Sequence, residues 1–166
     1  TGVNAEPKRI IAADLNGDGH TDVVTSSLGG MSASLGNGDG TFGPPQTDTS
    51  MQGYGVAVGD LNGDGLADIA VANYPGDALQ VALGNGDGTF GAPDSTAFPP
   101  GSHPYGIAMA DLNGDALPDI VVGTYTTNTL SVLVNTTVVP APTVTSVAPA
   151  TGSTDGGTSV TITGTD

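Results

Sequence analysis

The sequence of 166 residues contains no cysteine and no tryptophan, and its only cations are Lys8 and Arg9. Without cysteine, a disulfide scaffold and a thiolate metal site are both excluded. Two cations cannot neutralise enough phosphates to build a nucleic-acid-binding surface. No apolar run approaches the roughly 20 residues that a membrane-spanning helix requires. The chain therefore belongs to none of these classes.

Carboxylates supply nearly all of the charge. The chain has 17 acidic residues against 2 basic ones, which gives a formal charge of −15. Such a charge opposes compaction, and an acidic chain with few aromatics is often disordered. Yet 37% of the residues are hydrophobic, and they occur in short β-branched runs separated by glycine-rich turns, which favours an all-β fold. We therefore expect a bound group to neutralise part of the carboxylates.

Two short motifs recur along the chain. Residues 14–19 read Asp-Leu-Asn-Gly-Asp-Gly, residues 60–65 repeat them, and residues 111–116 repeat them with alanine in the last place. A glycine-rich block at 36–43 returns with the same residues at 84–91. Repeats of about 40–50 residues are typical of propeller blades and solenoid units.

Each repeat reads as a small antiparallel sheet. Short apolar runs precede and follow the acidic motif, and a third run alternates apolar and polar side chains, as on a half-buried strand. A fourth strand is expected around 41–42 and 89–90, after the glycine-rich hairpin turn. The third repeat has Asn-Thr-Thr at 135–137 in place of that turn. We predict three four-stranded antiparallel units and a short C-terminal β segment.

The acidic motif extends to a nine-residue frame, D-x-N-x-D-G-x-x-D. Positions 1, 3, 5 and 9 offer side-chain oxygens, and the backbone carbonyl of position 7 can add another. Hard oxygen ligands in a flexible loop favour Ca²⁺ over Zn²⁺ or copper, and Mg²⁺ is disfavoured because it requires near-ideal octahedral geometry. The frame is no EF-hand, because strands flank it and position 12 lacks glutamate. The predicted ligands are Asp14, Asn16, Asp18, His20 and Asp22, then Asp60, Asn62, Asp64, Leu66 and Asp68, then Asp111, Asn113, Asp115, Leu117 and Asp119.

The charge balance agrees with three calcium sites. Each frame holds three carboxylates, so without metal they repel one another. Three divalent ions would add six positive charges and take the chain from −15 to −9. The third site has Ala116 where the other two have glycine, and a Cβ in a left-handed turn costs about 1–2 kcal/mol. We therefore expect a weaker third site; the alternative is that all three motifs are ordinary Asp/Asn/Gly turns.

These motifs resemble FG-GAP/VCBS repeats, the calcium-binding blades of integrin-α-like β-propellers, over about residues 5–137. The resemblance implies four-stranded blades at about 5–50, 51–100 and 101–137, with Ca²⁺ held between the first and second strands by the side-chain ligands named above. Residues 138–142 are expected to be a linker. The segment 143–166 resembles the start of an immunoglobulin-like IPT/TIG domain.

Aromatic residues offer few further candidates. Tyr54 and Tyr105 precede the first strands of their repeats, where they are expected to pack in turns. Tyr74 and Tyr125 follow second strands and are expected to be exposed, where they could contact a sugar or a protein. Neither histidine has a partner that would suggest catalysis.

The resulting functional prediction is a non-enzymatic, calcium-binding module, secreted or on the cell surface, that serves adhesion, interaction or surface structure. The alternatives are a lectin-like carbohydrate-binding module and an accessory, non-catalytic segment of a secreted hydrolase. Propellers typically have 4–8 blades, and three would leave two apolar faces open. We therefore expect a chain excised from a longer one or a self-assembling one, in contact with further blades or with other copies of itself.

Overall fold

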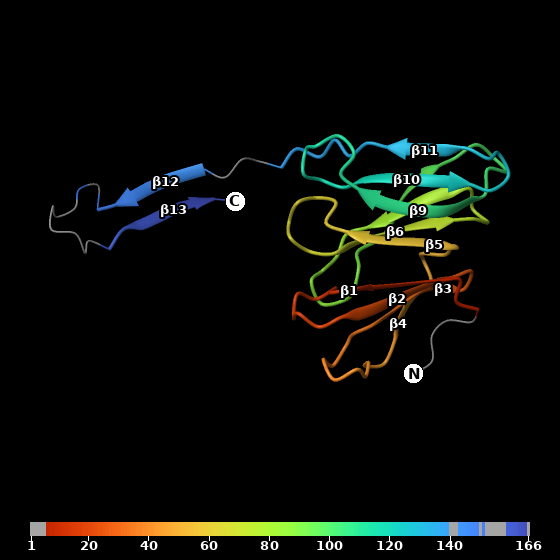
Figure 1. The fold of residues 1–166 in the computed structure, drawn as a ribbon, viewed down its shortest axis with the longest axis horizontal. Helices are drawn as coiled ribbons and strands as arrows, with labels where there is room; N and C mark the ends of the chain where they lie inside the picture. Colours follow the sequence, from red (N-terminus) through yellow and green to blue (C-terminus); the bar gives the residue numbers. More distant parts are fainter. Residues whose placement is uncertain (1–5, 140–142, 150, 152–158, 166) are drawn as a thin grey trace.

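The computed structural model describes residues 6–139, 143–149, 151 and 159–165. The fold is all-β, as predicted: three antiparallel sheets follow one another along the chain, and a separate two-stranded sheet lies at the C-terminal end (Figure 1). The part of the chain described contains no helix with the length and hydrophobicity that crossing a bilayer requires. The predicted linker at 138–142 falls largely outside the described residues.

The strands of each sheet are neighbours in sequence order, as in a meander. The first sheet consists of β1 (Arg9–Ala13), β2 (Asp22–Ser27), β3 (Gly30–Ser34) and β4 (Gln46–Asp48). The second consists of β5 (Gly55–Gly59), β6 (Asp68–Asn73), β7 (Ala78–Ala82) and β8 (Asp94–Ala97). The third consists of β9 (Pro104–Ala110), β10 (Asp119–Thr124) and β11 (Leu130–Leu133). The last pair is β12 (Thr143–Ala148) and β13 (Thr161–Thr165).

The fourth strands differ from the prediction in two ways. Residues 41–42 and 89–90 form no strand, and only the bridges Gly36↔Phe42 and Gly84↔Phe90 occur there. They close small loops, in which the Asn37 N–H donates to the Thr41 carbonyl at 3.0 Å. The fourth strands are instead β4, which returns to pair with β3, and β8, which returns to pair with β7. The third sheet has three strands rather than four, because the glycine-rich turn that starts this return is absent from its sequence.

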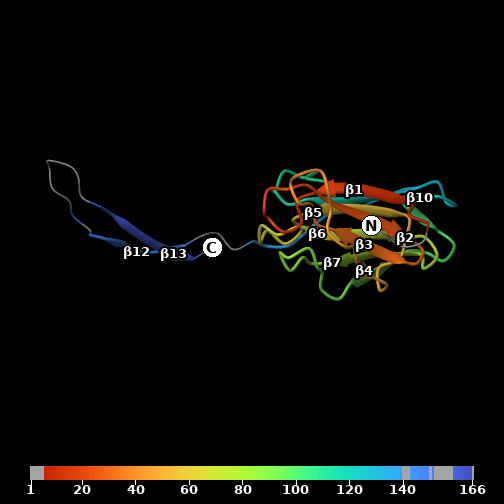
Figure 2. The ribbon, with the colours of Figure 1, turned by 90° about the horizontal axis from the view of Figure 1, so that it is seen from below.

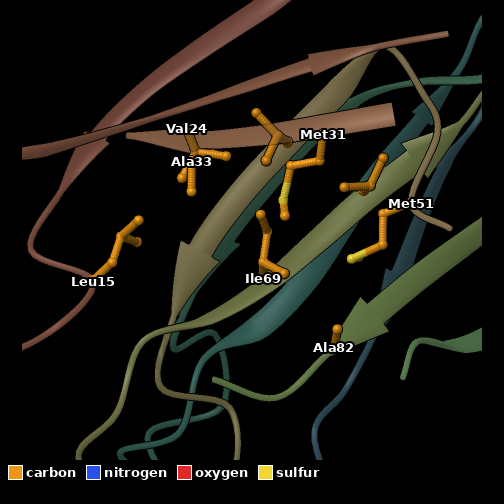
Figure 3. Packing of buried hydrophobic residues seen from close by; sticks show 9 residues of the cluster. Leu15, Val24, Met31, Ala33, Met51, Ile69 and Ala82 are labelled. Atoms are coloured by element: carbon orange, nitrogen blue, oxygen red, sulfur yellow. The ribbon is translucent and has the colours of Figure 1, made fainter. Parts of the chain in front are cut away.

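The apolar core lies between successive sheets. Met31, Val24 and Ala33 of the first sheet point toward Ile69 and Met51 (Figure 3), and all five are at most 3% exposed. A second cluster joins the second sheet to the third. The sheets are therefore stacked side by side (Figures 1 and 2), and each inner face is covered by the next sheet in the chain.

The end of the stack at the third sheet is uncovered. Leu61 of the second sheet is 8% exposed, whereas Leu112, at the same position of the third, is 54% exposed. Leu79 and its counterpart Leu130 differ in the same way, at 2% and 77%. The repeat therefore presents an apolar face that is buried wherever another sheet follows.

The first sheet leaves its opposite face open. Ile10 and Val23 lie on this face and line a groove of about 460 Å³ together with Thr25 and Phe42. Ile10 is 68% exposed, and the buried Thr25 hydroxyl has no hydrogen-bond partner among the described residues. Both end faces have the character of surfaces that another sheet would cover.

Candidate functional site

Each acidic loop joins the first strand of a sheet to the second and folds around its first aspartate. In the second loop, the two carboxylate oxygens of Asp60 accept the N–H groups of Gly63 at 2.7 Å and Gly65 at 2.9 Å. Asp14 and Asp111 accept the corresponding pairs in the other two loops. The three loops therefore share one conformation, as their shared frame predicts.

The middle of the loop is held by side-chain oxygens as well. The Asp64 N–H donates to the Asn62 amide oxygen at 3.0 Å, and the Leu66 N–H donates to the Asp64 carboxylate at 2.8 Å. The Asn62 amide nitrogen donates to the other Asp64 oxygen at 2.8 Å. In the first loop the backbone N–H of His20 is the main cause that lowers the pKa of Asp18. The Asp18 carboxylate is thus stabilised in its charged form by the loop itself.

The ninth position of the frame is buried rather than exposed. Asp22, Asp68 and Asp119 are all 0% exposed. Asp68 accepts the Leu61 N–H of its own loop at 2.8 Å and the Gly84 N–H, beyond the third strand, at 2.8 Å. It therefore fastens the acidic loop to the glycine-rich turn.

The same attachment recurs in the other two repeats. Asp22 accepts the N–H groups of Leu15 and Gly36, and Asp119 accepts that of Asn135 at 2.7 Å. The Asn135 side chain also donates to the Leu61 carbonyl at 2.6 Å, which ties the third sheet to the second. The predicted ligand at position 9 is thus a structural tie as well.

Burial raises the pKa of Asp68 because the charged form loses its hydration. The N–H groups of Gly84 and Leu61 oppose this rise, whereas the nearby carboxylates of Asp64 and Asp60 add to it. A carboxyl that is both buried and close to like charges is a place where a bound cation would have a large effect.

The left-handed turn predicted at Ala116 is present. Its φ is 73°, close to the 81° of Gly19 and the 82° of Gly65 at the same position. Gly65 holds the same position in the second loop, and a Cβ added there would lie within 4 Å of no other atom. We therefore infer that Ala116 carries backbone strain but is not crowded. The third loop therefore keeps the shape of the others at a conformational cost.

A second feature lies at the opposite ends of the strands, where all four tyrosines of the chain meet. Tyr54 and Tyr105 hold equivalent positions in the second and third sheets and stack at 5.0 Å. Tyr74 and Tyr125 follow the second strands of the same sheets, with ring centroids 6.4 Å apart. The four rings line a cavity of about 510 Å³. We call this set of four side chains the tyrosine surface.

The sequence did not reveal that these rings converge. Tyr54 contacts Tyr74 edge to face at 4.7 Å, so the residues expected to pack in turns and those expected to be exposed form one cluster. The ring of His103 stacks on Tyr74 at 4.5 Å. The equivalent spacing of the tyrosines from the acidic motif in both repeats is the signal that could have shown it.

Two regions of the chain match family models. The FG-GAP-like repeat model matches residues 14–71 and 60–122, and the IPT/TIG model gives a short match at 142–166. The chain belongs to the FG-GAP-like repeat family. The sheets of these FG-GAP-like repeats have a propeller-like arrangement, although the described residues do not close a ring.

Solved structures resemble the FG-GAP-like repeats as well. The Photorhabdus luminescens Tc holotoxin pore matches with a TM-score of 0.53 and 21% identity, over 80% of this chain and 6% of that one. A lectin of Agrocybe aegerita, solved for its recognition of non-reducing terminal N-acetylglucosamine, matches with a TM-score of 0.50 and 25% identity, over 77% of this chain and 38% of that one. The chain therefore spans only a minor part of either protein. No curated protein matches.

The donor chemistry of the FG-GAP-like loops suits calcium. Every side-chain acceptor in the frame is a carboxylate or amide oxygen, and a carboxylate has about four lone-pair sites. Asp60 uses its two oxygens for one N–H each, so acceptor capacity remains on both. Within the described residues, however, no three acidic or histidine side chains converge on one point. The oxygens face the loop's own N–H groups, which hold the loop in place.

Proposed function

We propose that the chain is a calcium-binding, non-enzymatic interaction module that works outside the cell. The observation that carries the proposal is the threefold recurrence of one loop, with the same oxygens held by the same hydrogen bonds at different points of the chain. The N–H groups that these four side chains accept account for part of the pattern. The oxygens keep further acceptor capacity, and a set of hard oxygen ligands repeated in three loops suits a divalent cation such as calcium.

Bound calcium would supply positive charge next to the carboxylates of each loop. The residues that would hold it are the frame residues of each loop, with Asp60, Asn62, Asp64 and Asp68 as the second set. Nine of the chain's 17 acidic residues belong to the three frames. Cation binding would therefore offset the charge of about half of the acidic residues, and the abundance of calcium outside cells suits weak, exposed sites.

Calcium titration tests this proposal. Titration of the metal-free chain by calorimetry is expected to show three sites, and Asp64→Ala is expected to remove one of them. Ala116 already has a φ of 73° in the loop itself, so Ala116→Gly is expected to relieve up to about 1–2 kcal/mol of strain in the folded chain and to change the affinity of the third site little. A titration with no saturable heat, or one in which Asp64→Ala retains all three sites, would contradict the proposal.

The interaction role is supported by the open end faces. The apolar side chains Leu112 and Leu130 at one end, and Ile10 at the other, lie where a further sheet would pack. We infer that further blades or a second copy of the chain cover these faces. Light scattering at rising concentration is expected to show a mass above that of the 16.1 kDa monomer. Leu130→Asp is expected to return the mass to the monomer value, and a wild-type monomer at all concentrations would refute the association.

A lectin-like role is the second candidate. The similarity to the Agrocybe aegerita lectin favours it, since that protein recognises N-acetylglucosamine. Sugar-dependent retention of the chain on a glycan array would support this alternative.

A further inference from the structure

We propose that the tyrosine surface binds the positively charged side chains of a partner protein, with arginine and lysine as the groups recognised. This inference deepens the proposed interaction role and does not depend on the calcium loops. It rests on the ring geometry, on a cation that the chain itself places there, and on the charge of the molecule.

The ring geometry provides several π faces around one point. The centroids of Tyr74, Tyr105 and Tyr125 form a nearly equilateral triangle with sides of 6.2, 6.3 and 6.4 Å. Their planes are inclined to one another by 82°, 38° and 52°. A cation above the middle of this triangle can lie within roughly 6 Å of all three centroids, the distance at which a ring face turned toward it attracts it. One face of Tyr74 is stacked on His103 and one face of Tyr105 on Tyr54, so each offers its other face.

The rings are accessible from outside. Tyr105 is 43% exposed and Tyr125 is 68% exposed. Exposed aromatic side chains that form a contiguous patch often mark an interaction site. The site is therefore open to a side chain that arrives from a second molecule.

The chain already shows the proposed contact once. In the first sheet, Lys8 occupies the position that Tyr54 and Tyr105 hold in the second and third sheets. Its ammonium group lies 5.6 Å from the centroid of the Tyr54 ring. Of the three equivalent positions, the first is thus a cation that contacts the aromatic ring of the second, Tyr54. We propose that a cation from a partner contacts the third, Tyr105, in the same way.

Charge complementarity decides between a cation and a neutral ligand. The formal charge of −15 attracts basic partners and speeds their encounter. The residues that line the cavity are all tyrosines, whose hydroxyls could also hydrogen-bond a sugar, so the lining does not decide between the two ligands and the charge does. The observations therefore favour a basic protein segment over a carbohydrate.

The experiment uses the tyrosine fluorescence of the chain, which reports on this surface alone because all 4 tyrosines belong to it and tryptophan is absent. The probe is tetramethylammonium, and the control is neopentyl alcohol, an uncharged analogue of similar shape. Both are added in millimolar calcium and physiological salt. Tetramethylammonium is expected to change the emission saturably, and neopentyl alcohol is expected to have no such effect. A short peptide with two arginines is expected to bind more tightly than its citrulline counterpart.

Matched variants locate the site. Tyr125→Leu keeps an apolar side chain but removes a π face, and should weaken binding about two- to five-fold. Tyr125→Phe keeps the face and should bind as the wild type does. Because Tyr125 is largely exposed, thermal melting by circular dichroism should show that both variants remain folded.

Equal binding of the charged and neutral probes, or unchanged affinity in Tyr125→Leu, would overturn the proposal. Saturable binding of N-acetylglucosamine without any of tetramethylammonium would assign the surface to carbohydrate instead. Calcium titration of the same variants separates the two proposals, because Tyr125→Leu should leave the metal sites intact.

Discussion

Chelation of calcium is expected to lower the melting temperature of the chain by on the order of 10 °C or more. A ligand at 100 times its Kd stabilises the folded state by about 2.7 kcal/mol per site, and each kcal/mol shifts the midpoint by a few degrees in a chain of this size. The physical reason is the repulsion among the three carboxylates of each frame, which a bound ion would offset and which returns when the ion leaves. Melting curves by circular dichroism in calcium and in EDTA measure the difference.

Two variants sharpen this result. Asp64→Ala breaks one frame, so it should show a smaller calcium-dependent gain than the wild type, by about one site's contribution. Asp94→Asn removes one negative charge from the exposed strand β8 and should keep the full gain, which controls for net charge. Superimposable melting curves with and without chelator would exclude a stabilising role for calcium.

The local parts of the fold follow directly from the sequence. The acidic frame predicts a loop between two strands, and all three loops lie there. The alanine at position 116 predicts a strained left-handed residue, and its φ of 73° agrees. These features depend on residues close together in the chain, whose turn chemistry is fixed by side-chain hydrogen bonds and by glycine.

The sequence does not predict where the return strands lie within a repeat or which side chains meet between repeats. The return strands β4 and β8 begin several residues after the glycine-rich turn, and their exposed sequences carry no alternation that would mark them. The tyrosine surface combines residues from two sheets, and periodicity within one repeat says nothing about which side chains meet across the stack. Only a comparison of equivalent positions, such as Tyr54 with Tyr105, contains that information.

The sequence predicts only one of the two roles that we assign to the ninth frame residue. Its carboxylate was predicted as a metal ligand, but its tie to the turn after the third strand joins residues far apart in the chain. The glycine at position 84 is the local sign of this tie, because a Cβ there would lie within 2.2 Å of the Ala67 carbonyl oxygen. At this place in the second repeat a side chain would collide with that carbonyl. In the third repeat Asn135 donates the equivalent N–H to Asp119, so the hydrogen bond itself does not require glycine.

Replacing Asp68 by alanine is expected to destabilise the chain by roughly 2–5 kcal/mol, even in EDTA. The carboxylate is fully buried and accepts two backbone N–H groups at 2.8 Å each. Its loss leaves the buried Leu61 N–H and the part-buried Gly84 N–H without this acceptor, and a fully buried donor left unpaired costs about 1–3 kcal/mol. Urea denaturation in the presence of EDTA measures this structural contribution apart from any metal.

Asp68→Asn is the informative partner of this variant. Its amide oxygen can accept one of the two N–H groups, while its amide nitrogen faces the other, so an intermediate loss is expected. Asp94→Ala, on an exposed strand, should leave stability unchanged within about 0.5 kcal/mol. If Asp68→Ala destabilised the chain only when calcium was present, the buried carboxylate would act through the metal alone. A loss of the same size in calcium and in EDTA would instead show that Asp68 stabilises the chain only through its tie between loop and turn, and would remove it from the set of metal ligands.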